Sequence, residues 1–290
     1  MPLHIHDHGG EGPPLLLLHG AGRSLADWDA AVPLLTPYHR VLAADLPAHG
    51  RSDGDAPWTV DAAVAAIEEA LRAYDVPDAI LVGHSLGGML AAVYADRHPG
   101  VTPGVVNLDG LWWEPVDSYT GEERESRKRV GEMTRATGGQ VAPPEYVEQQ
   151  VAYAGQFGIS AARAEASARA SARELPDGSW QMLPERDRWL ELLDALDGLD
   201  PLPTMRRLGC PLLVVVARRA QPPMPGMEWF EKLMGTHTRR MNAELAALVS
   251  ERPTAATADV DATHAMLLEE PEAVAELVLA FTRTTGTPAS

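Results

Sequence analysis

A serine held between glycines is the first residue in this sequence whose type and spacing could support covalent chemistry. Ala79 to Val82 is apolar, and the five residues Gly83-His84-Ser85-Leu86-Gly87 that follow fit the pattern G-x-S-x-G. In a sharp turn from a strand into a helix, glycines two residues before and after the serine remove Cβ atoms that would collide. The hydroxyl of Ser85 would then face a substrate. Because so short a pattern also occurs by chance, the predicted strand and helix around it determine whether it indicates a nucleophile.

The elements beside Ser85 are those that the pattern requires. The apolar run before it is typical of a buried strand, and Leu86 to Arg97 is predicted to be a helix, with Met89, Leu90, Val93 and Tyr94 on one side. Ser85 therefore lies at the carboxyl end of a predicted strand, where open α/β sheets place their chemistry.

The rest of the chain alternates in the same way between apolar strands and helical segments. Such alternation predicts an α/β fold with a mostly parallel, doubly wound sheet and right-handed crossovers. The other predicted strands are Leu15 to Leu18, Arg40 to Asp45, Gly104 to Asp109, Cys210 to Ala217 and Ala256 to Val260. The other predicted helices are Leu25 to Leu35, Trp58 to Tyr74, Trp229 to Val249 and Pro271 to Thr282.

A helical segment interrupts this alternation after Trp112. Residues 112–206 contain few β-branched runs and many helix formers. Helices are expected at Glu122 to Ala136, Pro144 to Phe157, Ile159 to Arg173 and Glu185 to Leu196. We therefore expect a core made of residues 1–111 and 207–290, with a helical cap inserted at 112–206.

Composition limits the kinds of partner. A chain of 290 residues can bury a large core without metals or disulfides, and its single cysteine, Cys210, excludes an intramolecular disulfide. The formal charge of −17 argues against nucleic acid or an anionic membrane as partner. No leader-like amino-terminal pattern and no apolar window of ~18 residues is present, so we expect a soluble cytoplasmic protein. The sequence leaves a homodimer open.

Two further patterns argue against a cofactor or a metal. The loop from His19 to Ser24 is rich in glycine, but it matches neither G-x-x-x-x-G-K-[ST] nor G-x-G-x-x-G, which disfavours a nucleotide fold. His4, His6 and His8 alternate along one strand without a nearby cluster of carboxylates or cysteines, which favours an edge strand over a metal site. We expect a small-molecule substrate and no cofactor.

Four separate matches in the right order carry a resemblance to a known family. They are His19-Gly20, the run from Asp45 to Ser52, the glycine-flanked Ser85, and Asp261 to His264 with Glu269 to Glu272 beyond it. Over nearly its whole length the sequence resembles the α/β-hydrolase superfamily, in the branch with a serine nucleophile and a helical cap.

The resemblance implies roles for three groups. A serine needs a base to take its proton, and an imidazole that titrates near pH 7 can do so. His264 stands after the last strand, in the position of the family's base. The resemblance also implies that the backbone N–H groups of Ala21 and Leu86 form the oxyanion hole.

The acid that orients the base is where this sequence departs from the commoner pattern. Many relatives place it after the strand that corresponds to Leu212 to Ala217, but here residues 218–222 contain no carboxylate. Some members of the superfamily place the acid one strand earlier, so we assign the role to Asp109. Asp259 and Asp261 stay open as alternatives, although they lie close to His264 in sequence.

The expected reaction is hydrolysis of a carboxylic ester, lactone or thioester of a small to medium apolar substrate through an acyl-serine. Relatives that cleave epoxides or haloalkanes use an aspartate at the position of Ser85. An acyltransferase, a cyclase, a lyase and a ligand receptor without catalysis stay open as alternatives. The predicted substrate pocket is lined by aromatic and methionine side chains that packing between cap and core would equally explain, namely Trp112, Trp113, Tyr119, Met224, Met227 and Trp229.

Overall fold

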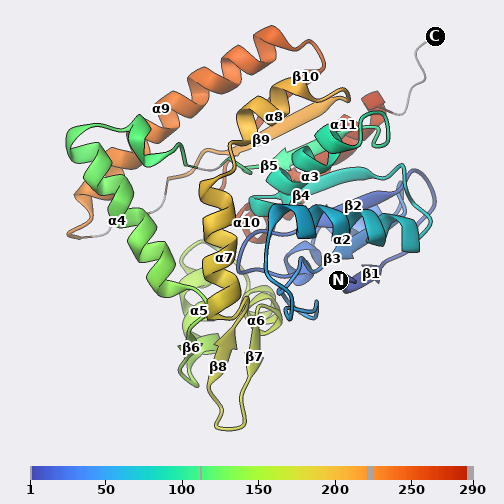
Figure 1. The fold of residues 1–290 in the computed structure, drawn as a ribbon. Helices are drawn as coiled ribbons and strands as arrows, with labels where there is room; N and C mark the ends of the chain where they lie inside the picture. Colours follow the sequence, from blue (N-terminus) through green and yellow to red (C-terminus); the bar gives the residue numbers. More distant parts are fainter. Residues whose placement is uncertain (1, 112, 221, 223–224, 286–290) are drawn as a thin grey trace.

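A seven-stranded sheet forms the centre of the computed structural model, which describes residues 2–111, 113–220, 222 and 225–285 (Figure 1). Its strands are β1 (Ile5–Asp7), β2 (Leu15–Leu18), β3 (Val41–Ala44), β4 (Ile80–His84), β5 (Val105–Leu108), β9 (Leu212–Ala217) and β10 (Ala255–Val260). They follow the order β1-β3-β2-β4-β5-β9-β10. Only β1 runs antiparallel to its neighbour; the remaining pairs are parallel.

Helices cover both faces of the sheet, because successive side chains of each strand point to opposite sides. In β2, Leu16 and Leu18 belong to one apolar core, whereas Leu15 and Leu17 belong to a second one. The first core is completed by α2 (Val60–Ala73), α3 (Leu86–Arg97), α7 (Arg186–Asp197), α8 (Pro201–Arg207) and α9 (Glu228–Glu251). The second is completed by η1 (Leu25–Trp28), α1 (Val32–Leu35), α10 (Met266–Glu269) and α11 (Pro271–Thr285). The predicted doubly wound α/β fold is confirmed.

The single helix predicted from Leu25 to Leu35 is wrong, because the structure divides this segment into η1 and α1. Pro33 lies in the first turn of α1. Proline has no N–H and clashes with the preceding helical turn, so a helix accepts it in the first turn but not in the interior. A helix that continued from Leu25 would have placed Pro33 in its interior.

Most of the segment between β5 and β9, from η2 (Val116–Ser118) to α7, lies to one side of the central sheet in Figure 1, in green to yellow, whereas α8 lies beside β9. Its helices are η2, α4 (Gly121–Thr137), α5 (Tyr146–Gly155), α6 (Ala161–Ala170) and α7, followed by α8. It also contains a three-stranded antiparallel sheet made of β6 (Val141–Ala142), β8 (Trp180–Met182) and β7 (Ala172–Glu174).

This small sheet was not expected, since a helix was predicted to run to Arg173. Strands β7 and β8 are joined by a turn around Pro176-Asp177-Gly178, in which Gly178 has φ +83° and Leu175 N–H donates to Ser179 O at 2.8 Å. A proline, an aspartate and a glycine in this order are a known turn signal. The signal was present in the sequence, and it explains why the chain reverses between β7 and β8.

Polar contacts connect α6 to the central part of the molecule, and one of them joins Ser167 Oγ to Asp27 Oδ1 at 2.6 Å. Arg23 Nη2, in the loop before η1, donates to Ser167 Oγ at 2.6 Å. Arg163 Nη1 donates to the carbonyl oxygen of Leu268, in α10, at 2.6 Å. Arg23 follows β2 and Leu268 follows β10, so these contacts involve segments that leave the carboxyl ends of sheet strands. In the described residues, no helix is long and apolar enough to cross a membrane.

Candidate active site

The turn between β4 and α3 holds Ser85 in a strained backbone conformation, with φ 52° and ψ −117°. A Cβ atom on Gly83 would lie 2.2 Å from the backbone C and O atoms of Gly87, and one on Gly87 would lie 2.3 Å from the carbonyl oxygen of Leu18. Real Cβ atoms do not approach backbone so closely, so both positions require glycine. The spacing of the motif follows from these two contacts.

The side chains of Asp109 and His264 meet across 155 residues of sequence. His264 Nδ1 lies 2.7 Å from Asp109 Oδ2. Asp109 directly follows β5 with φ 52°, and its second carboxylate oxygen, Oδ1, accepts the Ala217 N–H at 3.2 Å. The end of β9, where many relatives carry the acid, therefore supplies a backbone donor to a carboxylate from the neighbouring strand.

The surroundings of Asp109 favour its ionised form. Burial by itself would raise the pKa of the carboxyl group, but the hydrogen bond and positive charge of His264, together with the Ala217 N–H, hold that pKa below its usual value. An ionised Asp109 accepts a proton-bearing Nδ1, which leaves Nε2 of His264 available as a base. The His264 side chain is 54% exposed, so a substrate can reach it.

The two alternative acids are engaged elsewhere. Asp259 lies 2.7 Å from Arg218 Nη2, and Asp261 lies 3.3 Å from Arg219 Nε. Both side chains are more than half exposed. Among the three carboxylates considered, the structure brings Asp109 to His264.

The loop that contains Ala21 lies directly against Ser85. A Cβ atom on Gly20 would be 3.2 Å from the Cβ atom of Ser85, and Gly87 N–H donates to His19 O at 3.1 Å. Within the described residues, the N–H groups of Ala21 and Leu86 donate no hydrogen bond to another backbone group. Both donors therefore remain available beside the serine, as an oxyanion hole requires.

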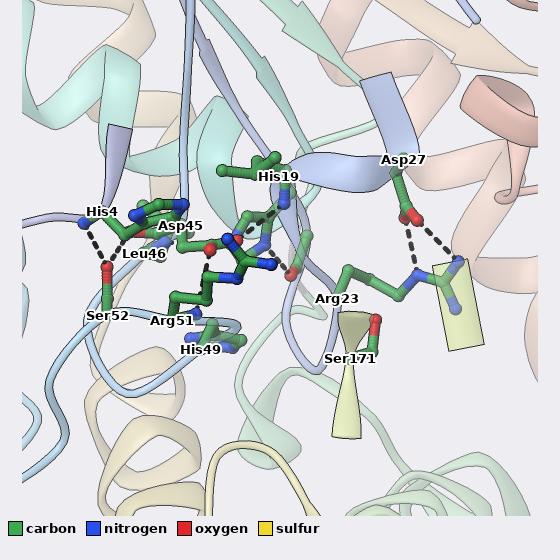
Figure 2. A network of polar contacts seen from close by, with 12 residues as sticks. His4, His19, Arg23, Asp27, Asp45, Leu46, His49, Arg51, Ser52 and Ser171 are labelled. Atoms are coloured by element: carbon green, nitrogen blue, oxygen red, sulfur yellow. Dashed lines mark hydrogen bonds and ion pairs between the residues drawn. The ribbon is translucent and has the colours of Figure 1, made fainter. Parts of the chain in front are cut away.

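A buried polar network holds this loop in place (Figure 2). His19 Nε2 accepts the Leu46 N–H at 2.9 Å, and His49 Nε2 accepts the Gly22 N–H at 3.0 Å. The Asp45 carboxylate accepts the N–H groups of Leu25 at 2.8 Å and of Arg51 at 2.9 Å. Burial, followed by the charge of His19, lowers the pKa of His49 to about 3. The neutral ring of His49 can therefore accept the Gly22 N–H. Through this bond and those of Asp45, the run from Asp45 to Ser52 holds the loop that contains Ala21.

Two of the predicted pocket residues, Trp113 and Tyr119, have partners that contact each other, since His237 Nδ1 lies 3.4 Å from Glu114 Oε2. Trp112 and Met224 lie outside the described residues. Trp113 packs against the ring of His237 with centroids 4.4 Å apart, and the buried Tyr119 donates its hydroxyl to Glu114. Met227 immediately precedes α9, and Trp229 lines a groove between α4 and α9. Their role in binding stays a prediction.

A different cavity, of about 110 Å³, lies beside the loop that carries His264. Thr263 and Ala265, on either side of His264, form part of its wall. The opposite wall comes from α5, α6 and the turn between them, including Phe157, Ile159 and Ala164. Sequence reasoning did not identify these residues, because the helices that carry them are far from Ser85 along the chain.

No group of three or more metal-binding side chains is found among the residues that the structure describes.

Comparison with known proteins agrees with this arrangement. A family model described as "alpha/beta hydrolase fold" matches residues 13–145. The crystal structure of E-2-(acetamidomethylene)succinate hydrolase aligns with a TM-score of 0.72 and 22% identity, covering 97% of this chain and 95% of that one. With the sheet order and the turn at Ser85, these matches define the chain as a protein of the α/β-hydrolase fold.

Curated relatives match over shorter regions. A pimeloyl-[acyl-carrier protein] methyl ester esterase from Methylococcus capsulatus is 38% identical over 101 residues, which cover 35% of this chain and 38% of that protein. Lipase LipV from Mycobacterium tuberculosis is 33% identical over 147 residues, which cover 50% of this chain and 51% of that protein. The matches thus span about half, or less, of these relatives.

The close approach at the turn predicts a large loss of stability when Gly83 gains a side chain. Gly83→Ala should lower the free energy of unfolding by ~2 kcal/mol or more, because backbone atoms of Gly87 and Gly88 must move. Gly155→Ala is the matched control, since a Cβ atom there meets nothing within 4 Å. Urea-induced unfolding measures both. Equal stabilities of Gly83→Ala and the parent would contradict the steric explanation.

The lowered pKa of Asp109 predicts how stability depends on pH. Its unfolded-state pKa is about 3.9, so the ionised carboxylate stabilises the fold above pH ~4, and this contribution is lost as pH falls through the lower folded-state pKa. Asp109→Asn should therefore reduce the unfolding free energy more at pH 6 than at pH 3. Urea unfolding at both values tests this, with the exposed Asp78→Asn as control. An effect of Asp109→Asn that is equal at both pH values would disprove it.

Proposed function

We propose that this protein is a serine hydrolase that cleaves a carboxylic ester, lactone or thioester through an acyl-Ser85 intermediate. The 2.7 Å contact between His264 and Asp109, beside the strained turn that presents Ser85, is the observation that carries the proposal. The relatives named as an esterase and a lipase support the same reaction class.

In the proposed mechanism, Oγ of Ser85 attacks the carbonyl carbon as Nε2 of His264 takes the hydroxyl proton. The N–H groups of Ala21 and Leu86 stabilise the oxyanion, and Asp109 stabilises the imidazolium. Collapse of the intermediate breaks the bond to the alcohol or thiol, which takes the proton from His264. Water, activated by the same imidazole, then releases the acid and restores Ser85.

We further propose that residues 112–206 act as a cap, and that the cavity beside His264 receives an apolar, uncharged part of the substrate. The charged groups in its wall are already paired. Arg23 donates to both carboxylate oxygens of Asp27, at 2.7 and 3.0 Å, and Glu269 accepts the Thr263 N–H at 3.0 Å and contacts Arg219. An apolar cavity of ~150 Å³ holds a benzene ring in another protein. A cavity of about 110 Å³ therefore suits a short or medium chain.

The first test concerns the triad. Ser85→Ala should abolish both labelling by a fluorophosphonate probe and hydrolysis of 4-nitrophenyl butyrate. Asp109→Asn should lower kcat by ~10⁴, because the imidazole loses the tautomer it needs. Asp259→Asn, at an exposed carboxylate, is the control and should keep the parent's kcat.

Two outcomes would contradict the triad. If Asp109→Asn stayed within a factor of ten of the parent while Ser85→Ala was inactive, Asp109 would not be the acid. If the folded parent gave neither a phosphonyl adduct nor turnover, the lyase or receptor alternative would be favoured. An acyl-Ser85 that reacts with an added alcohol or amine in preference to water would indicate an acyltransferase.

The second test concerns the cavity. Ile159→Ala should raise, and Ala164→Leu should lower, the ratio of kcat/KM for 4-nitrophenyl octanoate to that for the butyrate, since each methylene in an apolar pocket is worth about 1 to 3 kcal/mol. Ala166→Leu, exposed on the same helix, is the control. The parent should also hydrolyse 4-nitrophenyl pentanoate ~10-fold better than mono-4-nitrophenyl glutarate, whose carboxylate would be buried without a partner. If the octanoate-to-butyrate ratio of kcat/KM stayed unchanged in both Ile159→Ala and Ala164→Leu, the substrate chain would not bind in this cavity.

A further inference from the structure

A buried histidine directly precedes the serine and contacts the backbone of the base. His84 is the last residue of β4, and its side chain is 5% exposed. Its Nε2 lies 2.8 Å from the carbonyl oxygen of His264, 180 residues further along the chain. The contact therefore joins the turn that presents Ser85 to the loop that presents the imidazole.

The partner of His84 determines where its proton is. A carbonyl oxygen can only accept a hydrogen bond, so Nε2 of His84 must carry hydrogen and donate. Nδ1 of the neutral ring then bears a lone pair, and in the described part of the chain this buried atom has no hydrogen-bond partner. Burial, followed by the positive charge of His264, lowers the pKa of His84 to about 3. The ring thus stays neutral at every pH at which an imidazole base works.

The ring of His84 has little freedom to turn away from this contact. A Cβ atom on Gly20 would lie 3.1 Å from His84 Nδ1, so the loop of Ala21 closes over the ring. On its other side, the rings of His84 and His264 lie 4.7 Å apart, measured between centroids. One donor is therefore held in a fixed direction, toward the backbone of residue 264.

Such a fixed donor matters because packing does little to hold the His264 side chain, which is 54% exposed. Asp109 holds the ring at Nδ1, but a ring can pivot about that bond if its backbone shifts. The loop is also tied at Thr263, whose N–H donates to Glu269 at 3.0 Å. That tie connects the loop to α10 and not to Ser85, whereas the His84 contact connects it to the residue next to the nucleophile.

We propose that His84 is a positioning residue, whose Nε2–H···O bond to the His264 backbone sets the distance between the Ser85 hydroxyl and the base. This inference rests on the proposed function, because it assigns His84 to the same reaction. His84 takes no proton from the substrate or the serine. Its contribution is geometric, and displacement of a reacting group by about 1 Å can cost ~10²-fold in rate.

Three substitutions separate this role from simple packing. His84→Gln places an amide N–H near the position of Nε2, whereas His84→Asn reaches only the position of Nδ1. His84→Phe keeps a ring but has no donor. We expect kcat and the rate of phosphonylation of Ser85 to fall ~10²-fold in the Asn and Phe variants, with KM within about threefold of the parent. The Gln variant should recover to within about fivefold of the parent.

His39→Phe is the matched control. His39 is also 5% exposed and also contacts a carbonyl oxygen, that of Pro13, at 2.8 Å, but its other ring nitrogen faces Thr282. It should lower the melting temperature without changing kcat per folded molecule. Because both the His84 and the His39 variants can have a lower melting temperature, that measurement alone does not distinguish a positioning role from packing. The kcat of each variant is therefore measured below its unfolding transition.

Equal activities of His84→Gln and His84→Asn, or parent-like kcat in His84→Phe, would overturn the proposal. A readout independent of turnover is the ¹⁵N spectrum of the parent's imidazoles. It should show His84 as the neutral Nε2–H tautomer from pH 5 to 8, and the other tautomer or protonation in this range would also overturn it. If this spectrum is as expected but Ser85 reacts with no phosphonate, the proposed function fails, and the hydrogen bond still stands.

Discussion

The backbone contact between β4 and α3 is the constraint on which the neighbouring structure depends. Gly83 and Gly87 touch each other's backbone, and Gly87 also contacts Leu18 at the end of β2. The end of β2, the end of β4 and the start of α3 are therefore in close contact at this one turn. This close packing maintains the unfavourable φ and ψ angles of Ser85. It also brings the loop of Ala21 beside Ser85, where the buried polar network of His19, Asp45 and His49 holds that loop.

The position of Asp109 follows from the same parallel sheet. Strands β5 and β9 are hydrogen-bonded neighbours, so their carboxyl ends lie side by side. Asp109 N–H donates to Val215 O at 2.7 Å, and the Asp109 carboxylate accepts from Ala217. Since the two strand ends are adjacent, a carboxylate at either end lies close to the same imidazole. This gives a physical reason why an Asp-His pair forms although residues 218–222 contain no carboxylate.

Environment divides the histidines of this region into two kinds. His19, His49 and His84 are buried, and burial is the largest influence lowering their pKa values. Each works as a neutral ring that bonds backbone groups. His264 is more than half exposed and faces an ionised carboxylate. Residue type alone does not distinguish a base from a structural ring, because burial and the partner of each nitrogen decide which protonation states are accessible.

The sequence by itself determined the features that depend on local rules. The glycines around Ser85 follow from turn sterics, and the apolar periodicity was enough for the doubly wound sheet. Short-range signals at Pro33 and around Gly178 were equally present, although the helix predictions passed over them. Only the tertiary structure showed that Asp109, and neither of the aspartates nearer in sequence, contacts His264, because such a contact depends on which side chains fold together over long separations. For the same reason it alone revealed the cavity beside His264 and the bond from His84.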